Sequence, residues 1–467
     1  MNRVDYINIA YLVAALGFAM SLKWMSQAPT ARRGVFAGEI GFVIAVVATL
    51  FQPGMTDEGY ILIGVAVVVG SIIGVPLGLL VPMTSMPERI ALSHAFGGLA
   101  AGLVGVSFFF IKQDFVSEFN MAVIGGEVIL GFLVFTGSLM AAGKLIGWLP
   151  QRPIVYPGQN IANFLVLGAA VAAVIWLIVD PSNSYLIPVV AGLGAVFGIL
   201  LIVPIGGADM PTVIALLNSY GGLSAAMLGV VLDNKLLIVA GALDGASGLI
   251  LSIIMCRAMN RSFTNVLFGA FGAVDEVAAA DGPQGAVRSA STDEAADLLK
   301  TARSVVVVPG YGMAVAQAQH KVRELSDALD KEGVDVRFAI HPVAGRMPGH
   351  MNVLLAEANV PYEQLIDMDD INDDFGQVDV VLVLGANDVV NPAARHNESS
   401  PIYGMPILNV DQAGCIMVVK RGMSAGFAGI ENELFFNEKT LMVFGDAKGV
   451  VGELVSEVSG NRDAISI

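Results

Sequence analysis

The sequence predicts a polytopic α-helical membrane bundle of nine spans, followed by an α/β Rossmann-like domain with a parallel sheet. Three observations predict this fold class. Nine long apolar stretches fill the first 257 of 467 residues. Only 14% of the chain is charged, whereas soluble globular proteins carry about 25% charged residues. A buried-strand pattern and a glycine turn then follow at residues 304–312.

Each apolar stretch is long enough for a spanning helix, because about 20 apolar residues cross the hydrocarbon core of a bilayer. The first stretch is too long for a signal peptide, so we expect it to remain as an uncleaved span. The short connections predict a compact bundle. The predicted spans cover residues 6–24, 35–51, 60–81, 90–111, 121–145, 161–179, 185–205, 211–232 and 236–256.

Lys and Arg residues gather in one set of the predicted loops, and such an excess marks the cytoplasmic side. Eight lie in this set and three in the other. With nine spans, the N-terminus is then periplasmic and the C-terminal domain is cytoplasmic. The eight are Lys23, Arg32, Arg33, Arg89, Lys144, Arg152, Arg257 and Arg261, and the three are Arg3, Lys112 and Lys235.

Glycines recur at four-residue spacing in several spans. Such small-residue faces let helix backbones approach closely, and tight packing alone explains most of them. The sets are Gly70, Gly74 and Gly78, then Gly98 and Gly102, Gly194 and Gly198, and Gly241 and Gly245.

Polar residues inside predicted spans are costly and usually mark a function. His94 shares a helix face with small residues such as Gly98 and Gly102, so we expect it in the bundle interior. Its imidazole can exchange a proton near neutral pH. The alternative is a histidine that only hydrogen-bonds a neighbouring helix. Asn218 also lies on a small-residue face, where it either orients water or a histidine or joins two helices.

Four acidic residues in or near the spans are weaker candidates. Asp244 lies on an interior face, whereas the face of Glu127 is less clearly interior. Glu39 is near an inner helix end, and Asp209 is in an inner loop beside the mouth of the bundle.

Composition changes after the last span and predicts three regions: a membrane domain over 1–260, a hinge over 261–300 and a nucleotide-binding domain over 301–467. Residues 275–297 are rich in Ala, Gly, Ser and acids, which is typical of a flexible linker. A capped short helix is expected from Thr292. From residue 258 on, 15 basic residues oppose 29 acidic ones, a balance that disfavours nucleic-acid binding.

The C-terminal region opens with the pattern of a dinucleotide-binding unit. A strand is expected over 305–309, then Gly310-Tyr311-Gly312, a helix over 313–332 and a strand over 334–340. The glycines let the backbone approach a pyrophosphate, and the helix N-terminus supplies amide donors. The third glycine position is Val315, and no acid follows the second strand. The missing acid argues against ordinary NAD binding.

Further strands are expected over 379–384, 407–410, 415–419 and 441–444. Ligands bind at the carboxyl ends of such strands, where Asn387, Asp388, Lys420 and Arg421 follow. Two adjacent cations suit an extra phosphate, although they are alternatively a solvated pair. The glycine- and proline-rich segment 341–350, with Arg346, is either a plain loop or faces a phosphate.

Six motifs resemble those of the β subunit of proton-translocating nicotinamide nucleotide transhydrogenase. The resemblance covers the whole chain. The motifs are PERIALSHAFG at 87–97, LNSY at 217–220, PGYGMAV at 309–315, VAGRMPGHMN at 343–352, GANDVVNP at 385–392 and Lys420-Arg421.

The resemblance implies that this chain binds NADP(H) in an inverted orientation, that Lys420 and Arg421 hold the 2′-phosphate, and that Asp388 lies near the nicotinamide. The loop after Arg421 would close as a lid, in which Phe427 replaces the tyrosine more common in the family. His94 and Asn218 would line the proton path. The implied cofactor-binding residues are Gly310, Tyr311, Gly312, Met313, Ala314, Val315, Arg346, Gly385, Asn387, Asp388, Lys420, Arg421, Gly445 and Asp446.

The implied activity is hydride transfer from NADH to NADP+, driven by protons moving inward across the bacterial inner membrane. An α subunit would carry NAD(H), and two αβ units would form a dimer. No metal is expected. A nucleotide-gated ion channel or transporter is the alternative. A membrane flavin reductase is disfavoured, because neither a further nucleotide fold nor a pair of haem-ligand histidines occurs in the spans.

Overall fold

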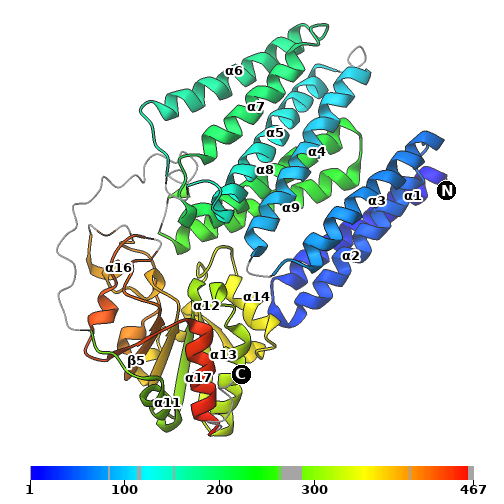
Figure 1. Ribbon diagram of the computed structural model, residues 1–467. Helices are drawn as coiled ribbons and strands as arrows, with labels where there is room; N and C mark the ends of the chain where they lie inside the picture. The colour runs from blue at the N-terminus through cyan, green and yellow to red at the C-terminus, as the bar shows by residue number, and fades with distance from the viewer. Residues whose placement is uncertain are drawn as a thin grey trace. The chain divides into compact units, whose positions relative to one another are not determined.

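The computed structural model describes residues 2–82, 85–112, 117–150, 153–260, 262–263, 287–398, 400, 402–426 and 428–460. The chain divides into two compact units, one helical and one built on a β-sheet (Figure 1). The first unit comprises most of the chain up to Ser252, and the second comprises most of the chain after that residue.

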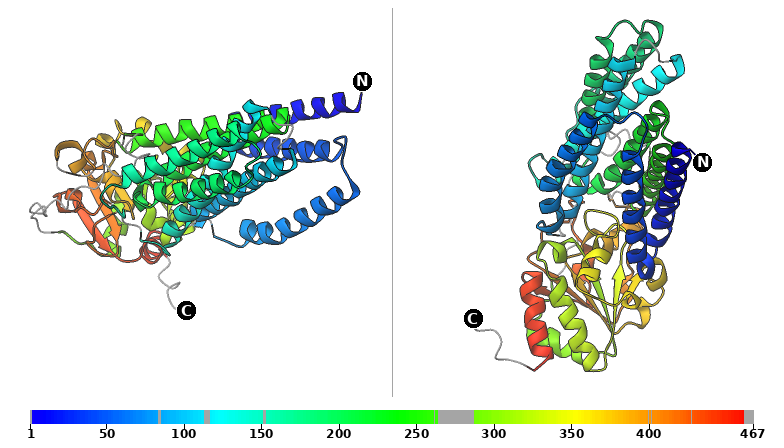
Figure 2. Two further views of the ribbon diagram at one scale, coloured as in Figure 1. Left: turned by 90° about the horizontal axis from the view of Figure 1, so that it is seen from above. Right: turned by 90° about the vertical axis from the view of Figure 1, so that its right-hand side faces the viewer.

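The first unit consists of long apolar helices lying roughly side by side (Figure 2). Among the described residues, eight helices are long and apolar enough to cross a membrane, which fits a multi-pass membrane protein. The apolar helix α7 has 17 residues, so a total of nine spans stays a prediction. The helices are α1 (Arg3–Met25), α2 (Ala28–Leu50), α3 (Asp57–Leu79), α4 (Met86–Lys112), α5 (Glu118–Ile146), α6 (Gln159–Val179), α7 (Leu186–Ile202), α8 (Met210–Val231) and α9 (Lys235–Ala258).

Glycine faces bring several helix backbones into contact, as predicted. On α4, a Cβ at Gly98 would lie 2.8 Å from the carbonyl oxygen of Gly131 in α5. On α7, a Cβ at Gly194 would lie 2.8 Å from the carbonyl oxygen of Ile129 in α5. Helices α8 and α9 approach in the same way at Gly222 and Gly245. Only glycine permits these separations, because any side chain would force the backbones apart.

The glycine row of α3 behaves differently. Gly70, Gly74 and Gly78 have open space where a Cβ would stand, and α3 has no buried residue. Within the described part of the chain, the predicted packing role of this row is therefore not realised.

The end of α7 is held by a buried lysine of α5. The Lys144 ammonium donates to the carbonyl oxygens of Val203 and Ile205, both at 2.6 Å, and to that of Ile202 at 3.2 Å. A cation suits this place because the last carbonyls of a helix lack intrahelical partners and carry partial negative charge.

The second unit is built on a six-stranded parallel sheet with the strand order β3-β2-β1-β4-β5-β6. This is the doubly wound order. The chain adds β2 and β3 on one side of β1 and then crosses to add β4, β5 and β6 on the other side, so the strand order reverses between β1 and β4. Helices α13 and α17 pack side by side on one face (Figures 1 and 2). The strands are β1 (Ser304–Pro309), β2 (Asp335–Ile340), β3 (Leu365–Asp367), β4 (Val380–Leu384), β5 (Cys415–Lys420) and β6 (Thr440–Phe444).

Fully buried aliphatic side chains from alternate strand positions form the core of this unit. Val306 and Val308 of β1, Val381 and Val383 of β4, and Ile416 of β5 belong to one cluster. This explains the continuous apolar runs in the sequence, because a parallel sheet covered on both faces buries every residue of its central strands.

Two elements differ from the sequence prediction. The expected helix over 313–332 is two helices, α12 (Tyr311–Val315) and α13 (Gln319–Lys331). Gln317 takes a left-handed φ of 50°, and the Ala318 amide bonds back to the carbonyl of Met313, which ends α12. The expected strand over 407–410 is also wrong. The Leu408 amide donates to the carbonyl of Val389, outside the sheet. The sheet contains a strand that was not predicted, β3, which is third in the sequence.

Part of the predicted linker is ordered. Residues 275–286 lie outside the described residues, but Ser289 forms a parallel bridge with Met442 of β6. The helix α11 (Thr292–Thr301) follows, and its N-terminus has a capping box in which Ser291 and Glu294 bond to each other's backbone amides. The predicted capped helix is therefore confirmed.

Candidate functional site

The carboxyl edge of the sheet brings together the polar and glycine-rich segments predicted to bind a nucleotide. Pro309 pairs with Leu384, Leu384 pairs with Val419, and Lys420 pairs with Phe444. The segments that follow β1, β4, β5 and β6 therefore leave the sheet next to one another. This edge includes the β1–β4 reversal, where open α/β sheets bind their ligands.

Three glycines let the ends of β1 and β4 touch. The amide of Gly310 donates to the carbonyl of Leu384, and that of Gly312 donates to Gly385, both at 2.9 Å. A Cβ on Gly312 would lie 2.7 Å from the Gly385 Cα, and Gly385 has a φ of +65°. The backbone at the reversal point is thus free of side chains. A planar or phosphate group can approach it closely.

The residues after the second glycine serve the turn in different ways. Met313 and Ala314 are fully buried, so their side chains are not accessible to a ligand. Val315 is 50% exposed. Because α12 has only five residues, the turn does not open a long helix, contrary to the prediction.

Arg346 stacks over the aromatic ring of Tyr311, with its guanidinium carbon 4.4 Å from the ring centroid. This contact carries a cation from the loop after β2 to the glycine turn after β1. The Arg346 amide donates to Nδ1 of the fully buried His350 at 3.1 Å. Gly345 has a φ of +104°, and a Cβ there would meet the His350 ring. Burial and the nearby Arg346 lower the pKa of His350 to about 4.

A second buried histidine secures the start of the same loop. His341 Nε2 lies 2.9 Å from the carbonyl oxygen of Pro406, and its Nδ1 accepts from the amide of Val343 at 3.2 Å. The Nε2 atom therefore donates, which fixes a neutral tautomer. Burial lowers the pKa of His341 to about 4. Neither histidine was expected from the sequence to have a role. Their place beside a glycine- and proline-rich loop was the available signal.

The loop after β5 rests on the residues that follow β4. The Ala428 amide donates to Asp388 Oδ2 at 3.0 Å. A Cβ on Gly426 would lie 2.8 Å from Asn387 Nδ2, so glycine is needed where the loop passes. Asn432 Nδ2 donates to both oxygens of Asn387, at 3.0 and 3.1 Å. Phe427, where a lost hydroxyl was expected to matter, lies outside the described residues.

Lys420 and Arg421 stand at the end of β5 in different surroundings. The Lys420 ammonium donates to the carbonyl of Ser424 and lies 5.0 Å from the centroid of the Phe435 ring. Burial lowers the pKa of Lys420, and the carboxylate of Asp388 opposes that shift. Arg421 is exposed, and no ion pair forms on it within the described ranges. With Arg346, these residues bring three cations to the edge that also carries Asp388 and Asp446.

Gly445 and Asp446 follow β6 at this edge. The Gly445 amide donates to the carbonyl of Lys420 at 3.0 Å. The Asp446 carboxylate caps α17 (Ala447–Val458), accepting from the amides of Lys448 and Gly449 at 3.1 and 3.4 Å. In this structure Asp446 stabilises a helix N-terminus, and its predicted contact with a cofactor stays a prediction.

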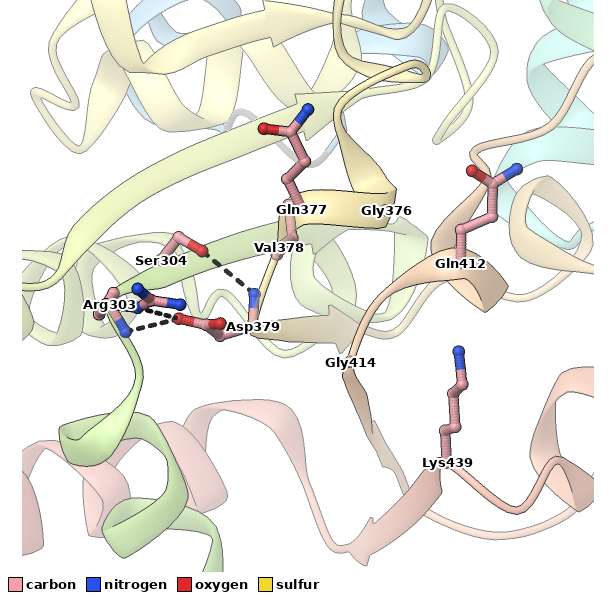
Figure 3. A pocket seen from close by; sticks show the side chains of 9 residues that line it. All are labelled: Arg303, Ser304, Gly376, Gln377, Val378, Asp379, Gln412, Gly414 and Lys439. Carbon is pink, nitrogen blue, oxygen red and sulfur yellow. Dashed lines mark hydrogen bonds and ion pairs between the residues drawn. The ribbon is translucent and has the colours of Figure 1, made fainter.

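A groove lies at the opposite, amino edge of the sheet (Figure 3). It is lined by residues that precede or begin strands, among them Ser304, Asp379 and Lys439. The Asp379 carboxylate accepts from the Arg303 amide at 2.9 Å and pairs with its guanidinium at 3.6 Å. The groove is separated from the glycine turn by the length of the strands, so it takes no part in the site at the carboxyl edge.

The helical unit contains a polar cluster formed by three helices. His94 of α4 lies close enough to interact with Asn218 of α8 and Asp244 of α9. Asn218 Nδ2 donates to Asp244 Oδ1 at 3.0 Å. A Cβ on Gly248 would meet the Asn218 amide at 3.0 Å. Each of the three residues was expected in the interior from the sequence. The structure brings them together, but His94 and Asn218 are half-buried and Asp244 is exposed, so the prediction of an interior Asp244 is wrong.

Comparison with known proteins decides the family. The family model described as NAD(P) transhydrogenase beta subunit matches residues 7–457. The chain belongs to the NAD(P) transhydrogenase beta subunit family. Two curated relatives from Rhodospirillum rubrum, one of them assigned to a particular strain, are named NAD(P) transhydrogenase subunit beta. Each is 46% identical to this chain over 459 residues, covering 96% of the chain and 98% of the relative.

The family match extends over both units. It includes the helices that carry His94, Asn218 and Asp244 and the sheet edge that carries Lys420 and Asp388. Membership in the transhydrogenase beta subunit family therefore applies to the membrane-type bundle and the Rossmann-like domain as one chain.

Proposed function

We propose that this chain is the membrane subunit of a proton-translocating transhydrogenase: NADH + NADP+ + H+(outside) → NAD+ + NADPH + H+(inside). The supporting observation is that one chain carries two features: a glycine-lined sheet edge with three cations, and a His94–Asn218–Asp244 cluster formed by three helices. NADP(H) would bind to this chain and NAD(H) to a partner α subunit, since the family is a beta subunit family.

The residues of the sheet edge fit a phosphorylated dinucleotide. The contact of Gly310 and Gly312 with Gly385 leaves bare backbone for a pyrophosphate. Lys420 and Arg421 supply donors for a 2′-phosphate, and Arg346 supplies a third cation near the turn. Bound NADP(H) would supply the carbon that accepts or gives the hydride. Residues such as Asp388 need only hold and shield it, because hydride transfer depends chiefly on positioning.

The polar cluster of the bundle would carry the proton. The imidazole of His94 takes a proton from one side and releases it to the other, while Asn218 and Asp244 orient it. The excess of Lys and Arg in one set of loops supports a cytoplasmic sheet domain and a periplasmic N-terminus, in a bacterial inner membrane that we infer with the proposed function. We further propose that two αβ units form a dimer.

The test is to reconstitute the chain with its α subunit in sealed liposomes and to follow NADP+ reduction and proton movement together. A pH gradient that drives protons toward the side of the sheet domain should accelerate reduction by NADH, and an uncoupler should abolish the acceleration. A reduction rate indifferent to the gradient would exclude the proposal. Ion flux that responds to NADP(H) without hydride transfer would instead support a nucleotide-gated channel or transporter.

A further inference from the structure

Glu127, in the N-terminal half of α5, is a fully buried carboxyl group. Its side chain is 0% exposed, and neither Oε1 nor Oε2 has a partner of hydrogen-bond geometry among the described residues. The main-chain amide of Gly105 in α4 lies close enough to interact with it. An unpaired carboxylate in such a place would be very costly, so the group is expected to hold a proton at rest.

The neighbouring helices make room for this carboxyl group but offer it no charge. A Cβ on Gly105 of α4 would lie 2.7 Å from the Glu127 Cδ, so that glycine leaves the space that the carboxyl fills. From α8, the Ser224 hydroxyl donates to the Glu127 carbonyl oxygen at 3.3 Å. From α6, Val174 packs against the adjacent Gly125. No charged group of the described helices interacts with Glu127.

Glu127 lies along the same line of contact between α4, α5 and α8 as His94. On α4, residues 94, 98, 102 and 105 share one face, and Gly105 is about 16 Å beyond His94 at 1.5 Å per residue. On α8, Asn218 lies beside His94, and Ser224, about 9 Å further along, lies beside Glu127. Between these levels, Val134 of α5 contacts both Gly98 and Gly221.

Relative to His94, Glu127 is closer to the ends of α4 and α5 that carry Lys112 and Glu118, and further from Arg89. The Lys and Arg distribution assigns the Lys112 end to the outside. Glu127 therefore lies in the outer half of the bundle.

We propose that Glu127 is a second proton-binding site, which passes protons between the outer side and the His94–Asn218–Asp244 cluster. This inference rests on the proposed function. In one turnover the O–H bond of Glu127 breaks and an N–H bond forms on His94. His94 then releases a proton toward the inner side, and Glu127 regains a proton from outside. No oxidant or reductant takes part. The separation from His94 exceeds one hydrogen bond, so the transfer needs intervening water.

The test compares three variants in sealed liposomes with the α subunit. Glu127→Gln keeps the shape of the protonated acid but cannot release a proton, so proton uptake and gradient-driven NADP+ reduction should fall about 100-fold. Affinity for NADP(H) should stay unchanged. Glu127→Asp keeps a carboxyl group and should retain part of the uptake. Glu118→Gln, on the exposed first turn of the same helix, is the matched control and should behave as wild type.

A spectroscopic readout separates a proton site from a neutral packing group. The infrared difference spectrum between the NADP+ and NADPH forms should contain a band of a protonated carboxyl group that is absent in Glu127→Gln and present in Glu118→Gln. Glu127→Gln with wild-type proton uptake, or a spectrum without that band, would overturn the inference. A wild-type protein that does not move protons would overturn the proposed function instead.

Discussion

Lys420 and Arg421 are adjacent in the chain, but they offer a ligand different interactions. Lys420 is half-buried and is already bound to the carbonyl of Ser424, whereas Arg421 is exposed. A half-buried cation has lost part of its hydration, so a phosphate that pairs with it gains more than one that pairs with a fully solvated cation. Lys420 is therefore the more informative residue to substitute.

Lys420→Ala should weaken binding of NADP(H) by roughly 10- to 150-fold, because a hydrogen bond to a charged group contributes about 1.5–3 kcal/mol. Binding of NAD(H) to the αβ complex should not change. Separate fluorescence titrations with NADPH and with NADH measure the two affinities. Lys439→Ala, at the amino edge of the sheet, is the matched control. Equal losses for NADP(H) and NAD(H) would argue against a 2′-phosphate contact.

The two buried histidines predict acid sensitivity of the sheet domain. The pKa of each is about 4 in the folded protein, against an ordinary value of 6.5, so between these values the unfolded chain binds more protons. Their stabilising contribution is complete above pH 6.5 and falls as pH decreases toward 4, by up to about 3 kcal/mol for each histidine.

Thermal unfolding of the sheet domain in the intact chain, followed between pH 4 and 7.5, checks that stability falls as the pH decreases. His350→Asn keeps an acceptor for the Arg346 amide but does not titrate, so its unfolding temperature should depend less on pH. An unaltered pH dependence in this variant would rule out the contribution of His350.

At the scale of secondary-structure elements, glycine packing between α4 and α5 has a direct test. A Cβ on Gly131 would lie 2.7 Å from the Gly102 nitrogen, so Gly131→Ala must separate two helices. We expect a loss of about 1–3 kcal/mol in stability. Gly74→Ala on α3 meets open space and should be neutral or slightly stabilising.

The comparison is made by thermal unfolding of the detergent-solubilised protein. Similar losses in the two variants would mean that contact between α4 and α5 does not set the effect. Because Gly98 and His94 lie on the same face of α4, Gly131→Ala should also impair proton movement, whereas Gly74→Ala should not.

Elements with strong local signals were predictable, and those that depend on tertiary contacts were not. The apolar runs of β1 and β4 identified buried strands, and Gly333, with a φ of +83°, ended α13 as expected. The three-residue strand β3 has no periodicity of its own and exists through its pairing with β2. The break at Gln317 was missed because glutamine seldom adopts a positive φ.

At the scale of the whole molecule, the proposed function requires that His94 affect proton movement and leave the sheet edge intact. His94→Ala should abolish proton uptake and the response of NADP+ reduction to a pH gradient, with NADP(H) still bound. A typical coupling of 1–3 kcal/mol changes affinity by about 5- to 150-fold, so the dependence of NADP(H) affinity on the gradient should also disappear.

His320→Ala provides the control, because His320 is an exposed residue of α13 in the sheet domain. It should pump and reduce NADP+ as the wild type does. Unchanged pumping in His94→Ala would remove this histidine from the proton path. Loss of NADP(H) binding in that variant would point to a general folding defect.

The amino-acid sequence by itself determined the membrane-type bundle, the change to a parallel-sheet domain, and most of the residues at the sheet edge. These features arise from apolar run length, strand pattern and glycine turns, which depend on residues close together in the chain. Tertiary structure alone decided that Asn218 bonds Asp244, that His350 holds the Arg346 loop, and that Glu127 faces Gly105. Such contacts depend on which helix and loop faces meet, and local sequence patterns do not specify those meetings.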